Sequence, residues 1–264
     1  MTVLNDADNL YLDTRQVSAV YVGDALVWGA PGFDPTGIAG LKVWLDASEV
    51  VEAPGAAAAL ANLAPGGATA STVGTPPPTV GTALQNGNKV VRFRANEGRL
   101  RMTGTGVKWA HTLVYVARLV GPTAGRVITA AYQPPNYVTG FWNALEDVAY
   151  STTGTFFTPD VRKAWTTNWH LYGMDADASP EFGGTGYHPR LLSDGVVLST
   201  GGQADGYCQM ADAWYDTFNI SGYSPTGTEE TCDCEVAEVL LYDRKLADAE
   251  RQQVEGYLRT KWGL

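Results

Sequence analysis

The chain has 264 residues, a formal net charge of −10 and an isoelectric point near 4.7. Only 18 residues are Lys or Arg, too few for the clustered basic surface that follows nucleic-acid phosphates, so we expect no nucleic-acid partner. Charged residues make up 17% of the chain against about 25% in typical proteins, a composition that favours a rigid extracellular or virion β-protein.

The N-terminus carries no targeting signal in its residue pattern. Residues 1–6 are not a basic segment followed by an apolar stretch, and no window of the chain approaches the ~18 apolar residues of a membrane span. We therefore expect neither a cleaved secretion signal nor insertion into a membrane.

Residues 9–29 predict a three-stranded meander with turns near Asp13-Thr14 and Gly23-Asp24. So short a piece buries too little apolar surface to offset its ordering entropy, so it needs a partner surface. We predict a separate module over residues 1–30 that mediates assembly. Its candidate contact residues are Tyr21, Val22, Leu26 and Trp28.

This segment resembles a known motif. A run of the form apolar-Tyr-x-Gly, here Val20-Tyr21-Val22-Gly23, leads to Val27-Trp28 and is similar to a motif at the starts of tail and minor tail proteins of phages that infect actinobacteria. The resemblance implies a protein made in the host cytoplasm and placed in the phage tail. It also implies other tail proteins and further copies of the chain, as a homo-oligomer such as a trimer, as partners.

A second domain is predicted over residues 31–264, after a hinge at Ala30-Pro31-Gly32. Residues 51–87, rich in Ala, Gly, Pro and Thr, predict a long surface connection in which residues 56–63 could hold a helical turn. The hairpin signal over residues 190–198 turns at Asp194-Gly195. Further strands are expected at residues 90–93, 99–102, 112–120, 126–131, 170–174 and 218–221.

The last thirty residues predict a strand, Cys234–Tyr242, followed by one amphipathic helix. The apolar residues of this helix recur at three- and four-residue spacing and form one stripe: Leu246, Val254, Tyr257, Leu258 and Trp262. Asp248 and Glu250 complement the helix dipole at its start, and Gly263 is a stop signal.

The chain resembles concanavalin A-like, LamG-type jelly rolls at both ends of this domain. The segments that show this resemblance are Gly40–Ser48, Lys89–Phe93, Ala237–Arg244 and Gly256-Tyr257-Leu258 of the helix. The resemblance implies an all-β fold, a jelly-roll β-sandwich with a C-terminal helix and a small N-terminal meander. Two positions depart from the family: Ala247 replaces a capping serine, at a cost of roughly 1 kcal/mol, and Arg94-Ala95 replaces Asp/Asn-Gly.

The three cysteines are expected to be reduced thiols when the chain is made. Cys232 and Cys234 lie two apart on a predicted strand and point to one face. A bridge from Cys208 to either one, formed outside the cell, stays open. A zinc site is not expected, because no second cysteine pair accompanies them.

Two acidic patterns are candidates for chemistry. Asp233-x-Glu235-x-x-Glu238 is similar to the carboxylates of laminarinase-type glucanases, but its residue order differs and its strand matches the non-catalytic family ending, so we interpret it as structural. Asp175, Asp177 and Glu181 offer oxygen ligands at alternating positions, as a calcium loop would. Pro180 and Gly186 stand where such a loop needs Gly and Glu, so we favour a solvated loop and expect no metal or cofactor, with Ca²⁺ as the weaker alternative.

No catalytic motif is found, and His111, His170 and His188 show no metal-ligand spacing. His170 is interpreted as a strand residue. What remains is a set of aromatic residues beside Asn, Gln or Asp in expected loops, a pairing that suits the apolar face and hydroxyls of a sugar. The candidate glycan-binding residues are Tyr132, Tyr137, Trp142, Tyr187, Trp214 and Tyr215.

The sequence therefore favours a phage minor tail protein that is not an enzyme and whose jelly roll binds host-surface polysaccharide. A glycoside-active enzyme on the same fold is one alternative. A decoration or connector protein without a ligand is another. Hydrolysis of cell-wall polysaccharide would favour the enzyme, and the absence of both binding and turnover would favour the connector.

Overall fold

A computed structural model describes residues 10–12, 15–17, 19–22, 25–29, 33–107, 110–130, 137–142, 145–151, 155–157, 163–176, 186–204, 215–222 and 230–264. In several strands only the backbone is described. The chain divides into two compact units, Met1–Ile38 and Ala39–Leu264.

The first unit contains two hairpins in place of the predicted three-stranded meander. β1 (Leu10–Leu12) pairs with β2 (Arg15–Val17), and β3 (Ala19–Val22) pairs with β4 (Ala25–Gly29), each pair as a separate two-stranded sheet. Among the described residues, the predicted middle strand contributes β2 to one hairpin and β3 to the other.

The unit boundary lies after Ile38, eight residues beyond the predicted position. The segment between them contains a 3₁₀ turn, η1 (Pro35–Gly37), whose start is capped by Asp34 accepting a 2.9 Å bond from the Thr36 N–H. A capped turn that begins with proline is ordered local structure. The predicted hinge at residues 30–32 lies outside the described residues.

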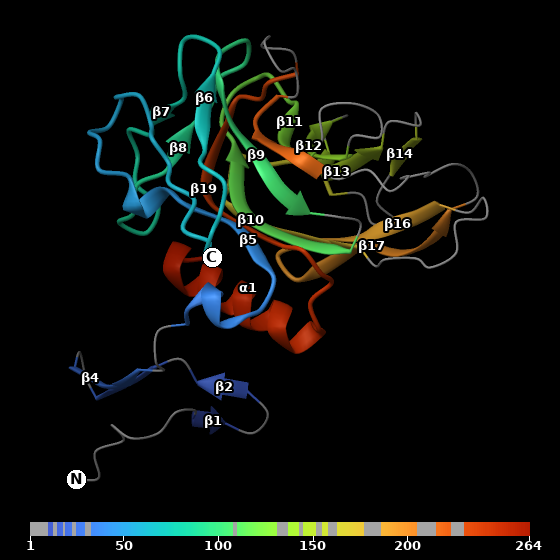
Figure 1. The fold of residues 1–264 in the computed structure, drawn as a ribbon. Coiled ribbons are helices and arrows are strands. Elements are labelled where there is room, and N and C mark those ends of the chain that lie inside the picture. The colour runs from blue at the N-terminus through green and yellow to red at the C-terminus, as the bar shows by residue number, and fades with distance from the viewer. Residues whose placement is uncertain are drawn as a thin grey trace. The chain divides into compact units, whose positions relative to one another are not determined.

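The second unit is a sandwich of two antiparallel sheets (Figure 1). In spatial order the eight-stranded sheet contains β17 (Val196–Ala204), β16 (Gly186–Ser193), β15 (His170–Ala176), β10 (His111–Leu119), β19 (Cys234–Tyr242), β8 (Val91–Arg92) and β7 (Thr79–Val80), with β5 (Leu41–Asp46) also paired to β19. The seven-stranded sheet contains β14 (Thr155–Phe157), β13 (Leu145–Ser151), β12 (Tyr137–Trp142), β11 (Arg126–Ala130), β18 (Tyr215–Ile220), β9 (Arg99–Val107) and β6 (Ser71–Val73). The predicted strands and the hairpin at Asp194-Gly195 are confirmed.

The core lies between the inner faces of the two sheets. Along β10 the inward side chains are Leu113, Tyr115, Ala117 and Leu119, which alternate with residues of the outer face. The Tyr115 hydroxyl lies 2.9 Å from Oγ1 of a buried threonine, Thr139 on β12, so a hydrogen bond joins the two sheets within the core. A buried hydroxyl pair of this kind satisfies both groups and fixes the register of the sheets.

The outer face of the eight-stranded sheet is covered by the helix α1 (Asp248–Trp262), which packs on β10 and β15. Burial on both faces explains why β10 reads as a nearly continuous apolar run instead of alternating. The predicted stripe is confirmed: Val254, Leu258 and Trp262 are fully buried and Tyr257 is half-buried. Among the described residues no helix is long and apolar enough to cross a membrane.

Both helix ends are stabilised by contacts of nearby residues. At the start, Ala247 has no capping side chain, but its N–H donates a 2.9 Å bond to Glu250, which Arg244 also binds at 2.6 and 2.8 Å. At the end, Gly263 adopts the left-handed conformation that closes the helix, with φ of 67°.

The turn that leads into β8 caps the last helical carbonyls. Gln85 donates a 2.6 Å bond to the carbonyl of Trp262, and Asn86 and Asn88 donate bonds of 3.0 and 3.1 Å to the carbonyl of Lys261. Three amides thus replace the solvent that would otherwise satisfy these groups.

The predicted surface connection, residues 51–87, is wrong in part. It holds β6, β7 and isolated bridges, with no helix over residues 56–63, and Ala58, Leu60 and Ala64 are buried. The Asn62 side chain accepts a 2.8 Å bond from the Trp44 N–H and donates to a neighbouring backbone carbonyl of β5. This anchoring pulls the segment onto the sheet and makes it part of the core layer.

Candidate functional site

The predicted glycan-binding residues are distributed over both sheets and beyond them. Tyr137 and Trp142 belong to β12, Tyr215 to β18, and Tyr187 to β16 of the other sheet. These four were expected in loops and instead lie in strands. The other two predicted residues, Tyr132 and Trp214, lie outside the described residues. Binding of sugar by this set stays a prediction.

The glycosidase-like acidic pattern is engaged by protein donors. Asp233 accepts 3.1 Å bonds from the N–H groups of Ala95 and Thr123. Glu235 is bound by the guanidinium of Arg118 at 2.7 and 2.9 Å. Carboxylates held in this way stabilise loops and strands, in agreement with the structural interpretation.

The third carboxylate, Glu238, is fully buried beneath α1. It accepts 2.8 Å bonds from the indoles of Trp44 and Trp262 and from the Tyr257 hydroxyl, and it lies 2.9 Å from the Lys261 ammonium. Burial raises the pKa of Glu238, and repulsion from a nearby aspartate adds to the rise against the opposing effect of the lysine. The group fastens the helix to β5 and β19.

The calcium-like pattern is represented among the described residues by Asp175 alone, while Asp177 and Glu181 lie outside them. Asp175 is buried and accepts bonds of 2.5 to 3.2 Å from the Arg190 guanidinium. The described part of the chain contains no group of three or more His, Cys, Asp or Glu side chains placed to hold a metal.

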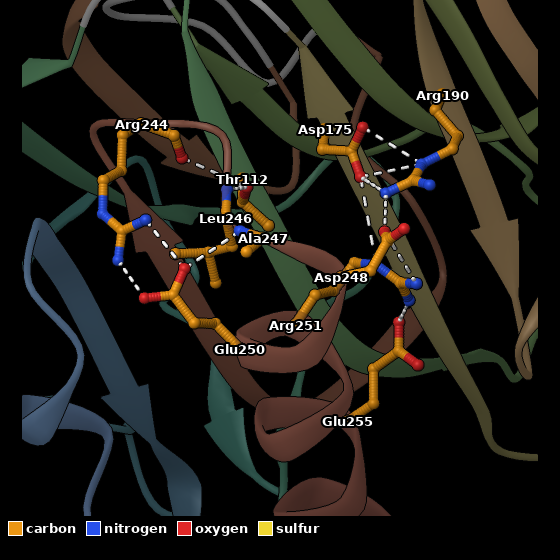
Figure 2. Close-up of polar contacts among 10 residues, drawn as sticks. All are labelled: Thr112, Asp175, Arg190, Arg244, Leu246, Ala247, Asp248, Glu250, Arg251 and Glu255. Carbon is orange, nitrogen blue, oxygen red and sulfur yellow. Dashed lines mark hydrogen bonds and ion pairs between the residues drawn. The ribbon is translucent and has the colours of Figure 1, made fainter.

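Asp175 joins an ion network under the first half of α1, as Figure 2 shows. Arg190 bridges Asp175 to Asp248 at 2.8 Å, and Arg251 pairs with Asp248 and Glu255. Because Arg251 and Glu255 are themselves nearly buried, the network ties the helix to β15 and β16.

Cys232 and Cys234 are free, buried thiols. Burial raises the pKa of the Cys234 thiol, and its hydrogen bond with Cys232 adds to the rise. The Cys234 thiol is therefore a poor nucleophile. Cys208 lies outside the described residues.

A series of polar contacts joins the loop before β15 to the hairpin tip between β16 and β17. Thr166 Oγ1 lies 2.8 Å from His170 Nε2, and His170 Nδ1 lies 2.6 Å from Asp194 Oδ2. Lys163 donates to the same carboxylate at 3.3 Å, and the Leu171 N–H donates to its other oxygen at 3.0 Å. His170 is the first residue of β15, as predicted.

The carboxylate of Asp194 is held in its ionised form. Burial alone would raise its pKa. Hydrogen bonds from His170 and from the Leu171 N–H outweigh this effect, with help from the charges of His170 and Lys163, and lower the pKa to about 2. The hairpin tip is thus an anionic anchor for the loop before it.

An aromatic side chain stands at the same end of the eight-stranded sheet. The Trp169 ring lies beside Arg118, whose guanidinium carbon is 4.9 Å from the ring centroid. Arg118 is in turn fixed by Glu235. In the loop before the ring, Thr167 and Asn168 are exposed.

Sequence reasoning did not select this cluster, although Trp165-Thr166-Thr167-Asn168-Trp169-His170 meets the criterion applied elsewhere, an aromatic residue beside Asn. Trp165 packs partly against the core, and Trp169 is half-buried.

No family profile and no curated protein matches the chain. Among solved structures it is similar to domain 4 of a GH43 extracellular arabinanase from Geobacillus stearothermophilus, solved with arabinotriose. The TM-score is 0.52 and the identity 10%, over 82% of this chain and 97% of that one.

Two further similar structures come from longer chains. The binding domain of botulinum neurotoxin DC in complex with SialylT matches at a TM-score of 0.54 and 7% identity, over 83% of this chain and 52% of that one. Trypanosoma rangeli sialidase with 2,3-difluorosialic acid matches at 0.53 and 14%, over 85% of this chain and 34% of that one. This chain therefore spans about half of the first and a third of the second.

At these identities the likeness is one of fold. Each match covers more than four fifths of this chain, which includes most of both sheets. Together with the two antiparallel sheets and the helix after β19, it shows that the chain has an all-β sandwich fold with a C-terminal helix.

Proposed function

We propose that the protein is a phage minor tail protein whose jelly roll binds host-surface glycan without cleaving it. The observation that carries the binding role is the likeness to the arabinanase domain, because the match covers 97% of a domain solved with arabinotriose. The toxin and sialidase structures, solved with SialylT and difluorosialic acid, support the same class of ligand. Fold alone does not assign function, so the proposal needs a direct test.

The tail placement rests on the N-terminal unit. Its resemblance to phage tail proteins is carried by residues 20–28, which form parts of the hairpin β3–β4. An isolated hairpin of this size is marginal in water, so a partner surface for Tyr21, Val22, Leu26 and Trp28 is the proposed reason for its retention. The proposed partners are other tail proteins and further copies of the chain.

The enzyme is the weaker candidate. Asp233, Glu235 and Glu238 are each engaged by backbone, arginine or indole donors, and Glu238 lies under α1. A retaining glycosidase needs two carboxylates facing one sugar. This arrangement of bonds supports a binding protein over a hydrolase.

The test uses the full chain, biotinylated and assembled on streptavidin so that weak single sites gain avidity. It is applied to an array of neutral and acidic oligosaccharides and to purified actinobacterial cell-wall polysaccharide, and released sugars are measured by chromatography. Binding without released sugar supports the proposal. Released sugar would favour the enzyme. If neither binding nor released sugar is detected, the connector is favoured. Mass spectrometry of purified virions tests the tail placement, which fails if the chain is absent from them.

A further inference from the structure

We propose that Trp169, with Thr167 and Asn168 of the preceding loop, forms a sugar-stacking subsite at the end of the eight-stranded sheet. The inference rests on the proposed glycan-binding function and gives it a location. It differs from the six aromatic residues predicted from the sequence, none of which belongs to this loop.

The first argument is the bracing of the ring. Arg118 lies over the Trp169 ring with its guanidinium carbon 4.9 Å from the centroid, and Glu235, nearly buried, holds that guanidinium at 2.7 and 2.9 Å. A cation stacked on an indole and fixed by a buried carboxylate restricts the ring to one orientation. A ring fixed before binding loses little conformational entropy when a sugar packs on it.

The second argument is the anchoring of the loop. The chain of contacts from Thr166 through His170 to Asp194 measures 2.8 and 2.6 Å, and Lys163 closes it onto the hairpin tip. The Thr166 hydroxyl also accepts a 3.2 Å bond from the Asn168 N–H. The loop is thereby tied at both of its ends, so Asn168 and the ring keep a constant relation to each other.

The order hydroxyl, imidazole and carboxylate also occurs in hydrolytic triads. Here the hydroxyl is already the acceptor of the Asn168 N–H, and it belongs to an exposed turn. A nucleophile needs donors placed to stabilise the oxyanion that it creates, and those donors are not part of the described cluster. We therefore assign the contacts to positioning of the loop.

The third argument is chemical complementarity. An indole ring packs on the apolar C–H face of a pyranose, while an amide both donates to and accepts from neighbouring hydroxyls. Thr167 and Asn168 are exposed, and no hydrogen bond of the Asn168 amide is found among the described residues. One ring with one amide suits one pyranose unit, so a single site should be weak and multiple copies should supply avidity.

The experiment compares Trp169→Phe, Trp169→Leu and wild type as full-length streptavidin assemblies on one array of neutral and acidic oligosaccharides. Phe keeps a flat ring, whereas Leu keeps apolar bulk without one. We expect Trp169→Leu to weaken binding about tenfold, Trp169→Phe by only a few-fold, and both to melt within a few degrees of wild type. Trp142→Ala serves as the comparison for the set predicted from the sequence.

Each result decides the proposal. Equal binding by wild type and Trp169→Leu overturns it while leaving glycan binding intact, and the subsite then lies elsewhere. Equal losses for Phe and Leu also overturn it, because ring stacking predicts partial rescue. If the wild type binds no sugar on the array or on cell-wall polysaccharide, the proposed function itself fails.

Discussion

The indole nitrogen of Trp262 donates a 2.8 Å hydrogen bond to Oε2 of Glu238, and both side chains are fully buried. The contact couples the apolar anchor of α1 to the polar group beneath it. Trp262→Ala should therefore lower the free energy of unfolding by roughly 3–5 kcal/mol through the cavity and the lost bond. Urea unfolding of wild type and variant measures this.

The control is Trp262→Phe, which keeps most of the ring volume and loses the bond, and it should cost less than the alanine variant. An alanine variant as stable as wild type would mean that the helix contributes little to the sandwich.

A second prediction concerns pH. Because burial raises the pKa of Glu238 above the 4.5 of the unfolded chain, the folded protein binds more protons than the unfolded chain between these two pKa values. The contribution of Glu238 to stability must therefore fall as pH rises through this window. Glu238→Gln cannot ionise, so its free energy of unfolding should fall less with rising pH than that of wild type. Parallel stability curves for the two proteins above pH 4.5 would refute the assignment.

The helix start offers a stabilising substitution. Ala247 occupies the N-cap with an extended backbone and no side-chain bond, while Glu250 already accepts from its N–H. Ala247→Ser should add the missing half of a capping box and raise the free energy of unfolding by about 1 kcal/mol. Thermal melts compare it with Ala247→Gly, which should gain less. A serine variant no more stable than the glycine variant would show that the cap does not form.

The hairpin tip gives the opposite pH dependence. The pKa of Asp194 is lowered to about 2 from the usual 3.8, so its stabilisation is present above pH 3.8 and is lost as pH falls toward 2. Asp194→Asn should cost about 1 kcal/mol at pH 7, a value discounted for the partial exposure of the group, and only a small fraction of that at pH 2. An equal deficit at both pH values would point to lost packing instead of lost charge.

The N-terminal unit yields a prediction about assembly. Deleting residues 1–30 should leave the melting temperature of the sandwich almost unchanged, because the chain divides after Ile38 into separately compact units. The same deletion should abolish incorporation into phage particles. Complementation of a deletion phage, followed by mass spectrometry of the virions, checks this, and equal incorporation of both forms would exclude an assembly role.

Features that depend on neighbouring residues could be predicted from the sequence. The helix stripe ending at Trp262, its stop at Gly263 and the hairpin at Asp194-Gly195 all follow from local spacing and backbone preference, and all are confirmed. Partners distant in the chain could not. The caps that Gln85 and Asn88 place on the helix end join positions more than 170 residues apart, and no local pattern reveals them.

The candidate site also depends on residues that are distant in the chain. An aromatic residue beside Asn is visible in the sequence at Trp169, but the same pattern occurs at Trp142 and at Tyr137. What distinguishes Trp169 is Arg118, which arrives from β10 and is fixed by Glu235 of β19. The pairing of these strands brings that support together, and it depends on the whole sheet.

The position of β19 also determines when the sandwich can fold during synthesis on the ribosome. β19 lies inside the eight-stranded sheet, between β10 on one side and β5 and β8 on the other, yet it is the last of the described strands to be synthesised. The hairpins of the first unit pair only neighbouring segments and can close while translation continues. The eight-stranded sheet cannot be completed until residues 234–242 emerge. The nascent chain therefore exposes apolar strand edges for most of its synthesis, and during that time it depends on protection from aggregation.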